Sequence, residues 1–302
     1  MDQPTTRIPK RLHKYRSFNA LTLSLLTNEN VYYADPTTFN DPLDCDPSIN
    51  VDTDRSTLEK LCFRMLTKRH GRDQALREMN NYIYMSSEYG DYKKDPEVAS
   101  YYMRSLASRI RKLIMEEFSQ QGVLSLASRW DCPLMWSHYA DQHQGICIEY
   151  SLAEHACETI FPVRYARRRS IRISELASWK LEGSSESAES IRQTFFFSKA
   201  PQWRYEREWR VLANRTGEQP APFRIASVYF GLRCSYAVTT NIVKLFENSG
   251  RSIKFYDIVA KDESFGLARR SVDVDEISAV GVTTSAILDF KDAFRDEPSA
   301  TS

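Results

Sequence analysis

Two kinds of segment alternate along this chain and restrict the folds open to it. From about Asp54 to Gln121, apolar residues recur at three- and four-residue spacing, and a glycine follows each of the two longest such segments. Segments rich in β-forming residues precede this stretch, in residues 12–50, and return after Gly122. A sheet built from these pieces has to join strands that are distant in sequence. The pattern therefore predicts an α+β fold whose sheet is interrupted by helices.

The predicted architecture is one domain with a mixed, mainly antiparallel sheet. Its core comprises residues 12–50 and 122–285, an all-helical insertion occupies 54–121, and residues 291–302 read as a disordered tail. The expected strands include "LHKYR" (12–16), "VLSLAS" (123–128), "ICIEYS" (146–151), "SIKFYDIVA" (252–260) and "ISAVGVT" (277–283). A short helix is expected in "CPLMWSHYADQHQG" (132–145), where Trp136 is a core candidate.

Bulk composition excludes several classes of protein. With 42% hydrophobic residues in 302, the chain has enough apolar material for a sizeable core. A net charge of +1 argues against a general polyanion binder, although the basic run "RYARRRSIRI" (164–173) could meet phosphate locally. The sequence has no apolar run long enough to span a bilayer and no signal-peptide pattern, so we expect a cytoplasmic protein that does not enter membranes.

Motif searches narrow the chemistry further. The six cysteines form no CxxC pair, which favours free, mostly buried thiols over disulfides or a zinc knuckle. The chain also lacks a P-loop, a GxGxxG turn, a GxSxG elbow and an HExxH helix. Kinase, dinucleotide-binding dehydrogenase and serine hydrolase interpretations therefore have little support.

The stretch "WRYEREWRVL" (203–212) carries the most unusual arrangement of charge. If it is a strand, Glu206, Glu208 and Arg210 point to one face. One interpretation is a half-exposed strand whose acids pair with arginines on neighbouring strands. The other is a site in which two adjacent carboxylates perform two different tasks.

A basic block near the start offers groups that could bind anions. In "LHKYRS", Lys14 and Arg16 share one face of the expected strand, with Tyr15 between them. Two cations on one face could hold a pyrophosphate, because arginine grips it with two hydrogen bonds and lysine acts as a point charge. The alternative is a basic edge strand beside a mobile terminus.

Two further stretches contain candidate ligands. In "FNDPLDCD" (39–46), the side chains of Asn40, Asp41, Asp44 and Asp46 suit turns around a proline better than a metal ion, with Asn40 or Asp41 as possible site-lining residues. His138 and His143 are five apart, which misses the shared helical face that a zinc pair requires. His138 and Tyr139 could instead stack on, or hydrogen-bond to, a ligand ring.

Five blocks together resemble a bacterial family known as domain of unknown function 2971. They are "HKYRSFNA", "VYYADPTTFNDPLDCD", "LSLASRWDCPLMWSHYADQHQGICIEY", "KAPQWRYEREWRV" and "VYFGLRCS", in that family's order. The resemblance extends from about Leu12 to Gly266. It implies little about activity, beyond an occasional association of such proteins with bacterial defence genes.

The chain also resembles the ADP-ribosyltransferases more distantly. Those enzymes carry an early Arg or His on a strand, a Ser- or Tyr-bearing strand followed by a helix and a strand, and a late acid-x-Glu pair. Arg16, the segment around Ser128, and Glu206 with Glu208 stand in that order here. This chain has Ser125 and Ser128 in place of a Ser-Thr-Ser triplet, and Ser rather than Gly follows Arg16.

The resemblance implies an NAD-cleaving mono-ADP-ribosyltransferase with NAD as substrate and no metal. The implied roles are phosphate binding by Arg16, nicotinamide binding by Ser128 with His138 or Tyr139, and action on the ribose by Glu208 and Glu206. Further cofactor-binding candidates are Lys14, Tyr15, Asn40, Asp41 and Arg210. The acceptor, protein or nucleic acid, stays open.

Two alternatives remain at this point. One is a metal-dependent hydrolase or nuclease that uses Asp41, Asp44, Asp46, His138 and a distant Glu. It requires the acidic loop to meet the histidines in space. The other is a module that senses or binds a nucleotide or a partner without turnover.

Overall fold

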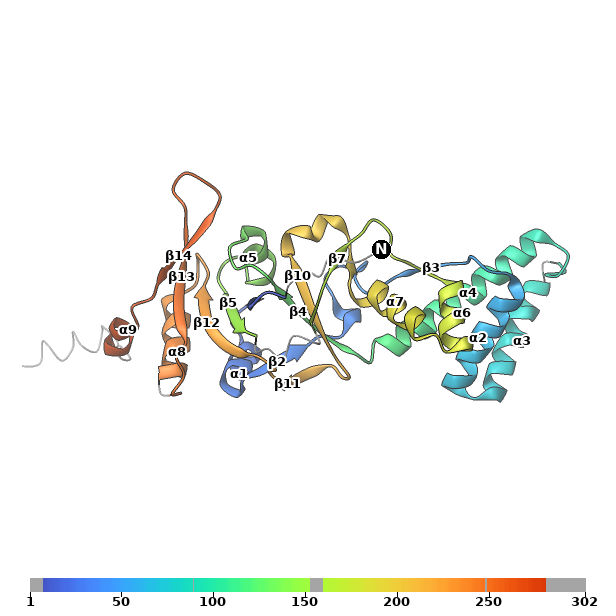
Figure 1. Ribbon diagram of the computed structural model, residues 1–302, viewed down its shortest axis with the longest axis horizontal. Helices are drawn as coiled ribbons and strands as arrows, with labels where there is room; N and C mark the ends of the chain where they lie inside the picture. Colours follow the sequence, from blue (N-terminus) through green and yellow to red (C-terminus); the bar gives the residue numbers. More distant parts are fainter. Residues whose placement is uncertain (1–7, 89, 153–159, 248, 281–302) are drawn as a thin grey trace, which may run out of the picture.

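The computed structural model describes residues 8–88, 90–152, 160–247 and 249–280. The molecule is elongated, with helices α2 to α4 at one end of its long axis and α8 and α9 towards the other (Figure 1). Between them stands a sheet whose neighbouring strands run mainly antiparallel, so the structure is a mixed α+β fold. Among the described residues, no helix combines the length and the apolar character needed to cross a membrane.

The main sheet joins strands from both ends of the sequence. Its order is β14-β13-β12-β5-β1-β4-β10-β6. The strands are β1 (Arg11–Arg16), β4 (Gly122–Ala127), β5 (Ile146–Ser151), β6 (Ile160–Pro162), β10 (Glu208–Ala213), β12 (Arg224–Phe230), β13 (Lys254–Ala260) and β14 (Leu267–Ser271). β12 and β13 run parallel, connected through α8 (Tyr236–Glu247), while the other described pairs in this sheet are antiparallel. β1 lies inside the sheet between β5 and β4, so it is not the basic edge strand that the sequence left open as an alternative. Both neighbours are distant from β1 in the chain, as expected for a sheet assembled from distant segments.

Short strand pairs and small helices connect the sheet to its surroundings. The pairs are β2 (Asn30–Tyr33) with β11 (Gly217–Pro220), β3 (Ser48–Asn50) with β8 (Ser170–Arg172), and β7 (Arg164–Tyr165) with β9 (Ser198–Lys199). The small helices are α1 (Ala20–Asn28), α5 (Pro133–Tyr139), α9 (Val274–Val280) and the 3-10 helices η1 (Pro36–Thr38) and η3 (Pro201–Glu206). Trp136 of α5 is fully buried, as the sequence predicted.

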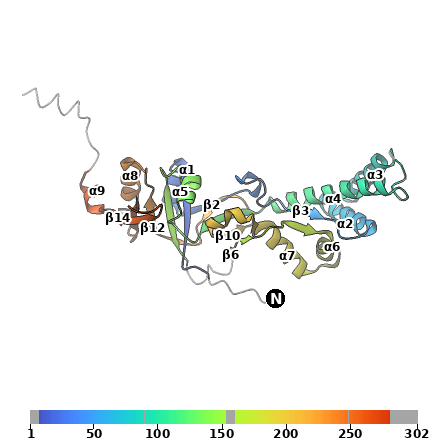
Figure 2. The ribbon, with the colours of Figure 1, turned by 90° about the horizontal axis from the view of Figure 1, so that it is seen from above.

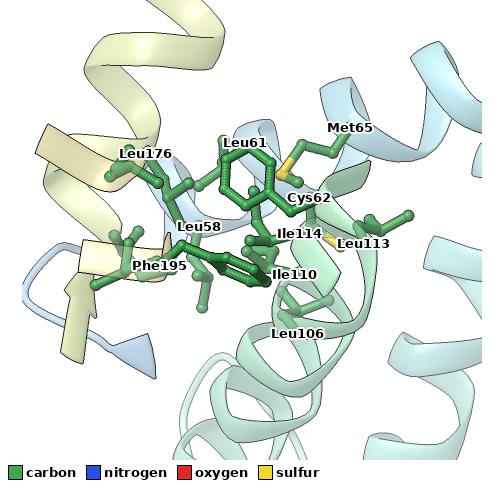
Figure 3. Packing of buried hydrophobic residues seen from close by; sticks show 14 of the residues in the cluster. Leu58, Leu61, Cys62, Met65, Leu106, Ile110, Leu113, Ile114, Leu176 and Phe195 are labelled. Atoms are coloured by element: carbon green, nitrogen blue, oxygen red, sulfur yellow. The ribbon is translucent and has the colours of Figure 1, made fainter. Parts of the chain in front are cut away.

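Five helices form a separate core beside the sheet. They are α2 (Arg55–His70), α3 (Arg72–Ser87), α4 (Pro96–Phe118), α6 (Ile173–Glu182) and α7 (Ser185–Phe196). Leu58 and Ile110 pack there against Leu176 and Phe195 of the later helices (Figure 3). Each such buried side chain stabilises the fold by about 1.5–3 kcal/mol. Seen from above, α6 and α7 lie alongside α2 and α4 (Figure 2), so the helical unit is larger than residues 54–121.

Local capping explains where these helices begin and end. Asp54 and Asp95 accept backbone hydrogen bonds at the first turns of α2 and α4. Gly183, at φ 82°, ends α6 in the left-handed region that glycine tolerates, and Ser184 then caps α7.

Two sequence-based expectations need correction. The segment from Trp203 is not a continuous strand, because Pro201 starts the 3-10 helix η3 and Arg207, at φ 46°, separates it from β10. The strand expected at 277–283 is also wrong over its described part: 274–280 forms helix α9, where Asp273 accepts a hydrogen bond from the Glu276 N–H. Residues beyond 280, including the expected tail 291–302, lie outside the described residues.

Candidate functional site

A cavity of about 250 Å³ lies at the centre of the sheet. β1 pairs with β5 at six positions but with β4 at a single position, His13 with Ala127. Beyond that point the side chains of Lys14 and Ser125 both line the cavity, which therefore opens where the two strands are no longer paired. Its charged and hydrogen-bonding lining residues are His13, Lys14, Tyr15, Thr38, Asn40, Asp44, Ser125, Tyr139, Lys199, Glu206, Glu208 and Arg210.

Glu206 and Glu208 reach this cavity from two different elements. Glu206 is the last residue of η3, and Glu208 is the first of β10. The ammonium group of Lys199 lies 2.5 Å from Oε2 of Glu206 and 3.2 Å from Oε2 of Glu208. Both acids are almost fully buried. One ammonium group thus bridges two carboxylates that lie on either side of the left-handed residue Arg207.

Arg210 provides the second cation and is completely buried. It binds Glu208 through Nε at 2.7 Å, and Asp44 through Nη1 and Nη2 at 2.9 and 2.6 Å. Nη1 also donates to the Phe196 carbonyl at 2.7 Å. Because a buried guanidinium is costly without partners, this network holds the strand β10 and the loop of Asp44 in one arrangement.

The two glutamates differ in how readily they take up a proton. Burial raises the pKa of Glu206, and the neighbouring Glu208 charge adds to the effect against the opposing charge of Lys199. Burial opposes the charge of Glu208 as well, but Arg210 and Lys199 outweigh it and lower the pKa of that carboxyl. Glu208 therefore stays ionised, while Glu206 takes up a proton more readily and is the better candidate for proton exchange.

Tyr139 and Asn40 complete the surroundings of Glu206. The Tyr139 hydroxyl donates to Oε1 of Glu206 at 2.6 Å, and Nδ2 of Asn40 donates to that hydroxyl at 3.4 Å. Both residues were sequence candidates, and both line the cavity. Burial and the Glu206 charge raise the pKa of Tyr139, so the phenol keeps its proton and holds Glu206 in place.

Lys14 brings a third cation to the same cavity. Its ammonium donates to the Ser125 carbonyl at 2.8 Å, across the unpaired part of β1 and β4. Burial, followed by repulsion from Arg16, lowers the pKa of Lys14 to about 8. At neutral pH the ammonium group is mostly charged, and Glu208 and Glu206 attract it electrostatically, which partly offsets the lowering of its pKa.

His13 lines the cavity and was not among the sequence candidates. Its Nε2 lies 3.2 Å from Oε2 of Glu149, and its Nδ1 lies 3.4 Å from the Ala127 carbonyl. Glu149 also accepts hydrogen bonds from Tyr229 at 2.7 Å and Ser227 at 3.2 Å. One feature of the sequence could have pointed to His13. The apolar strand "ICIEYS" contains an acid, Glu149, and a carboxylate buried on a central strand requires hydrogen-bonding partners.

Several sequence candidates lie elsewhere. Arg16 donates from Nε to Thr22 at 3.1 Å and does not line the cavity. Ser128 is also outside its lining, whereas Ser125, on the preceding strand, lines the cavity. His138 is exposed and packs against the rings of Trp203 and Tyr205.

Tyr15 lines the cavity with its ring, whereas its hydroxyl donates to the Arg129 carbonyl. The Asp41 carboxylate accepts from Nε1 of Trp203 at 2.7 Å and does not line the cavity, so it fixes the loop against η3.

The acidic loop does not gather its carboxylates in one place. Asp44 faces Arg210 and Lys199, Asp46 faces Arg111 and Arg169, and Asp41 faces Trp203. Within the described part of the chain, no group of three or more His, Cys, Asp or Glu side chains is arranged to hold a metal ion. Asp44 and Asp46 are therefore paired with cations of the protein itself, and Asp41 with an indole N–H.

Comparison with known proteins finds a family model that matches one segment of the chain. No curated protein and no solved structure matches the chain. Residues 135–211 match the model of the family described as "Protein of unknown function (DUF2971)". This segment contains most of the charged cluster of the cavity, namely Tyr139, Lys199, Glu206, Glu208 and Arg210. The match supports the resemblance to that family seen in the sequence.

Proposed function

We propose that the cavity binds the nicotinamide riboside end of NAD and that the protein is a mono-ADP-ribosyltransferase-like, NAD-cleaving enzyme. The observation that supports this most is the pair of glutamates at one cavity, both held by Lys199, with pKa values displaced in opposite directions. Two carboxylates in different protonation regimes can perform two different steps of one reaction. The position of Glu208 at the start of a late strand also agrees with the order of elements in that enzyme class.

The proposed reaction breaks the bond between C1′ of the ribose and the nicotinamide nitrogen. Nicotinamide leaves with the bonding electron pair, so positive charge develops on the ribose. The ionised Glu208 stabilises that charge electrostatically. A nucleophilic acceptor, or water, then forms the new bond at C1′ and gives its proton to Glu206.

The remaining lining residues would bind and orient the substrate. Lys14 offers an ammonium to a phosphate oxygen at the cavity wall. His13 lines the same wall, with both of its ring nitrogens already placed against Glu149 and the Ala127 carbonyl. A cavity of about 250 Å³ falls below the roughly 300–1,000 Å³ typical of pockets that enclose drug-sized ligands. It would therefore enclose one end of the dinucleotide and leave the adenosine end outside.

The direct test is release of nicotinamide from NAD by the purified protein, measured by chromatography. Glu208→Gln is expected to lower the rate at least about 100-fold, because it removes a preorganised charge from the transition state. Glu206→Gln is expected to lower it mainly when an acceptor is present. Exposed Glu263→Gln serves as the control for the same chemical change.

Circular dichroism and urea unfolding establish whether each variant is folded. Wild-type turnover by a folded Glu208→Gln variant would remove Glu208 from the mechanism. Absence of nicotinamide release from the wild-type protein, with and without cell extract as a source of acceptor, would contradict the enzymatic proposal.

One observation favours a second candidate, nucleotide binding without turnover. Both carboxylate oxygens of Glu208 already accept hydrogen bonds, from Arg210 at 2.7 and 3.1 Å and from Lys199 at 3.2 Å. A carboxylate engaged in this way serves well as a fixed structural charge. Saturable binding of NAD or ADP-ribose in calorimetry, with no product after prolonged incubation, would support this candidate over the enzyme.

A further inference from the structure

A second hollow, of about 470 Å³, lies beside the candidate site. Lys199 lines both hollows. The second one is bounded by residues 166–169, by 198–202 and by Leu43, and no Asp or Glu is among the described residues that line it. It contains the arginine run Arg167, Arg168 and Arg169, the cluster for which the sequence suggested contact with phosphate.

The loop that carries these arginines is fixed at both ends. β7 pairs with β9 just before the loop, and the Ala166 N–H donates to the Lys199 carbonyl at 3.0 Å. At the other end, the Arg169 carbonyl accepts from the Ser48 N–H at 3.2 Å. The hydroxyl of Tyr165, immediately before the loop, accepts the backbone N–H of Glu208 at 2.8 Å. The arginine run is therefore held in a defined position relative to the candidate catalytic carboxylate.

The described residues neutralise only part of the positive charge in the groove. Arg167 and Arg168 are exposed, and neither forms an ion pair with the described residues. Arg169 lies 3.5 Å from Asp46, which also pairs with Arg111. Since the net charge of the whole chain is only +1, this local excess is not a consequence of a generally basic surface.

We propose that this groove binds the phosphate backbone of single-stranded nucleic acid and presents that strand to the candidate site. Adjacent exposed arginines suit the repeated phosphates of a strand, and Leu43, which is half exposed in the groove, offers apolar surface to a base. The role of the strand as acceptor of ADP-ribose rests on the proposed function. The binding itself does not depend on turnover.

The test measures binding of a fluorescein-labelled 15-nucleotide single-stranded DNA, and of the same sequence as RNA, by fluorescence anisotropy at several salt concentrations. Arg167→Glu/Arg168→Glu is expected to weaken binding of at least one strand at least tenfold at low salt. The slope of log affinity against log salt concentration should also become shallower, by the amount expected for the loss of about two phosphate contacts. Nicotinamide release from NAD by the same variant, without acceptor, is expected to stay at the wild-type rate.

The matched control is Arg64→Glu/Lys68→Glu, which makes the same change of charge on α2, in another basic hollow. An equal loss of binding in both double variants would show general electrostatic attraction and overturn the assignment to this groove. So would failure of the wild-type protein to bind either strand, whether or not it cleaves NAD. If Arg167→Glu/Arg168→Glu weakens binding of ADP-ribose instead, the groove belongs to the pyrophosphate of the dinucleotide, and the proposal fails.

Discussion

Glu206 and Glu208 bind the same ammonium group, that of Lys199, although a left-handed residue separates them in the chain. Two buried carboxylates so close together repel each other strongly unless a cation lies between them. The Lys199 charge is in turn stabilised despite burial, because Glu208, Asp44 and Glu206 together raise the pKa of that lysine. Lys199 therefore joins the three carboxylates of the site and offsets part of their negative charge.

Removal of Lys199 should destabilise the protein strongly. Lys199→Met keeps the unbranched side chain but removes the ammonium that contacts three carboxylates. Asp44 and Glu208 then keep Arg210 as their ion-pair partner, and Glu206 keeps the Tyr139 hydroxyl. Loss of one partner from a buried ion pair typically costs about 3–5 kcal/mol of unfolding free energy. Urea unfolding at pH 7 measures the change. Lys94→Met, which breaks an exposed pair with Asp91, is the control and should cost less than about 1 kcal/mol. Equal stability of the two variants would contradict the role given to Lys199.

Replacement of Lys14 should have the opposite effect. Since burial lowers the pKa of Lys14 to about 8, keeping it charged at pH 7 costs stability. Between pH 8 and 10.5, the ordinary pKa of lysine, the unfolded chain binds more protons than the folded one. Lys14→Met is therefore expected to raise the free energy of unfolding at pH 7 by about 1–3 kcal/mol. The wild-type protein should gain stability from pH 8 to 10.5. The difference in unfolding free energy between Lys14→Met and the wild type should therefore become smaller over this pH range.

The same variant tests function. If Lys14 is kept for a ligand, Lys14→Met should weaken binding of ADP-ribose while it stabilises the fold. Urea unfolding at pH 7 and pH 10 and calorimetry measure the two effects. A Lys14→Met protein that is less stable than wild type at pH 7 would show that the ammonium is well satisfied in the folded state.

Local signals explain which helices could be predicted. The N-terminal caps Asp54 and Asp95 and the apolar spacing behind them are readable within one turn of sequence. That α6 and α7 join the same core could not be predicted, because contact of Leu176 and Phe195 with Leu58 depends on packing across more than a hundred residues. The segment at Pro201 was missed because its strand-like composition outweighed the proline that begins η3.

The candidate site shows the same division between local and long-range information. Strand periodicity placed Glu208 and Arg210 on one face, and they do share it in β10. Asp44 was explained by turn chemistry, and no spacing rule connects it with Arg210, which is 166 residues later. Lys199 was not singled out because its importance comes entirely from the carboxylates that surround it in the fold.

Glu149 should make stability depend on pH in the acidic range. Burial raises the pKa of this carboxyl, but hydrogen bonds from His13 and Tyr229 outweigh burial and lower the pKa to about 2. A lowered pKa contributes stability that is present above the unfolded value of 4.5 and is lost as the pH falls to about 2. Glu149→Gln is therefore expected to cost roughly 2–3 kcal/mol at pH 7 and progressively less below pH 4.5.

Urea unfolding of the wild type and of Glu149→Gln at pH 7, 4 and 3 measures how the difference in their unfolding free energies falls with pH. Exposed Glu263→Gln is the control and should follow the wild-type protein at each pH. A difference between wild type and Glu149→Gln that stays constant from pH 7 to pH 3 would mean that the ionised form of Glu149 is not what stabilises the sheet.

Gly145 should be intolerant of any side chain, because it brings the loop after α5 against the end of β1. A Cβ atom there would overlap the Arg16 carbonyl oxygen, at the end of β1, and lie 3.0 Å from the Ala140 carbonyl oxygen, at the end of α5. The Arg16 carbonyl belongs to the backbone and can give way only if the end of β1 shifts. Gly145→Ala is expected to cost about 1–3 kcal/mol or more in urea unfolding. Gly266→Ala is the control, since its nearest atoms belong to the movable side chains of Ser264 and Lys261. Similar stability of both alanine variants would show that β1, and with it His13 and Lys14 at the cavity, can shift without cost.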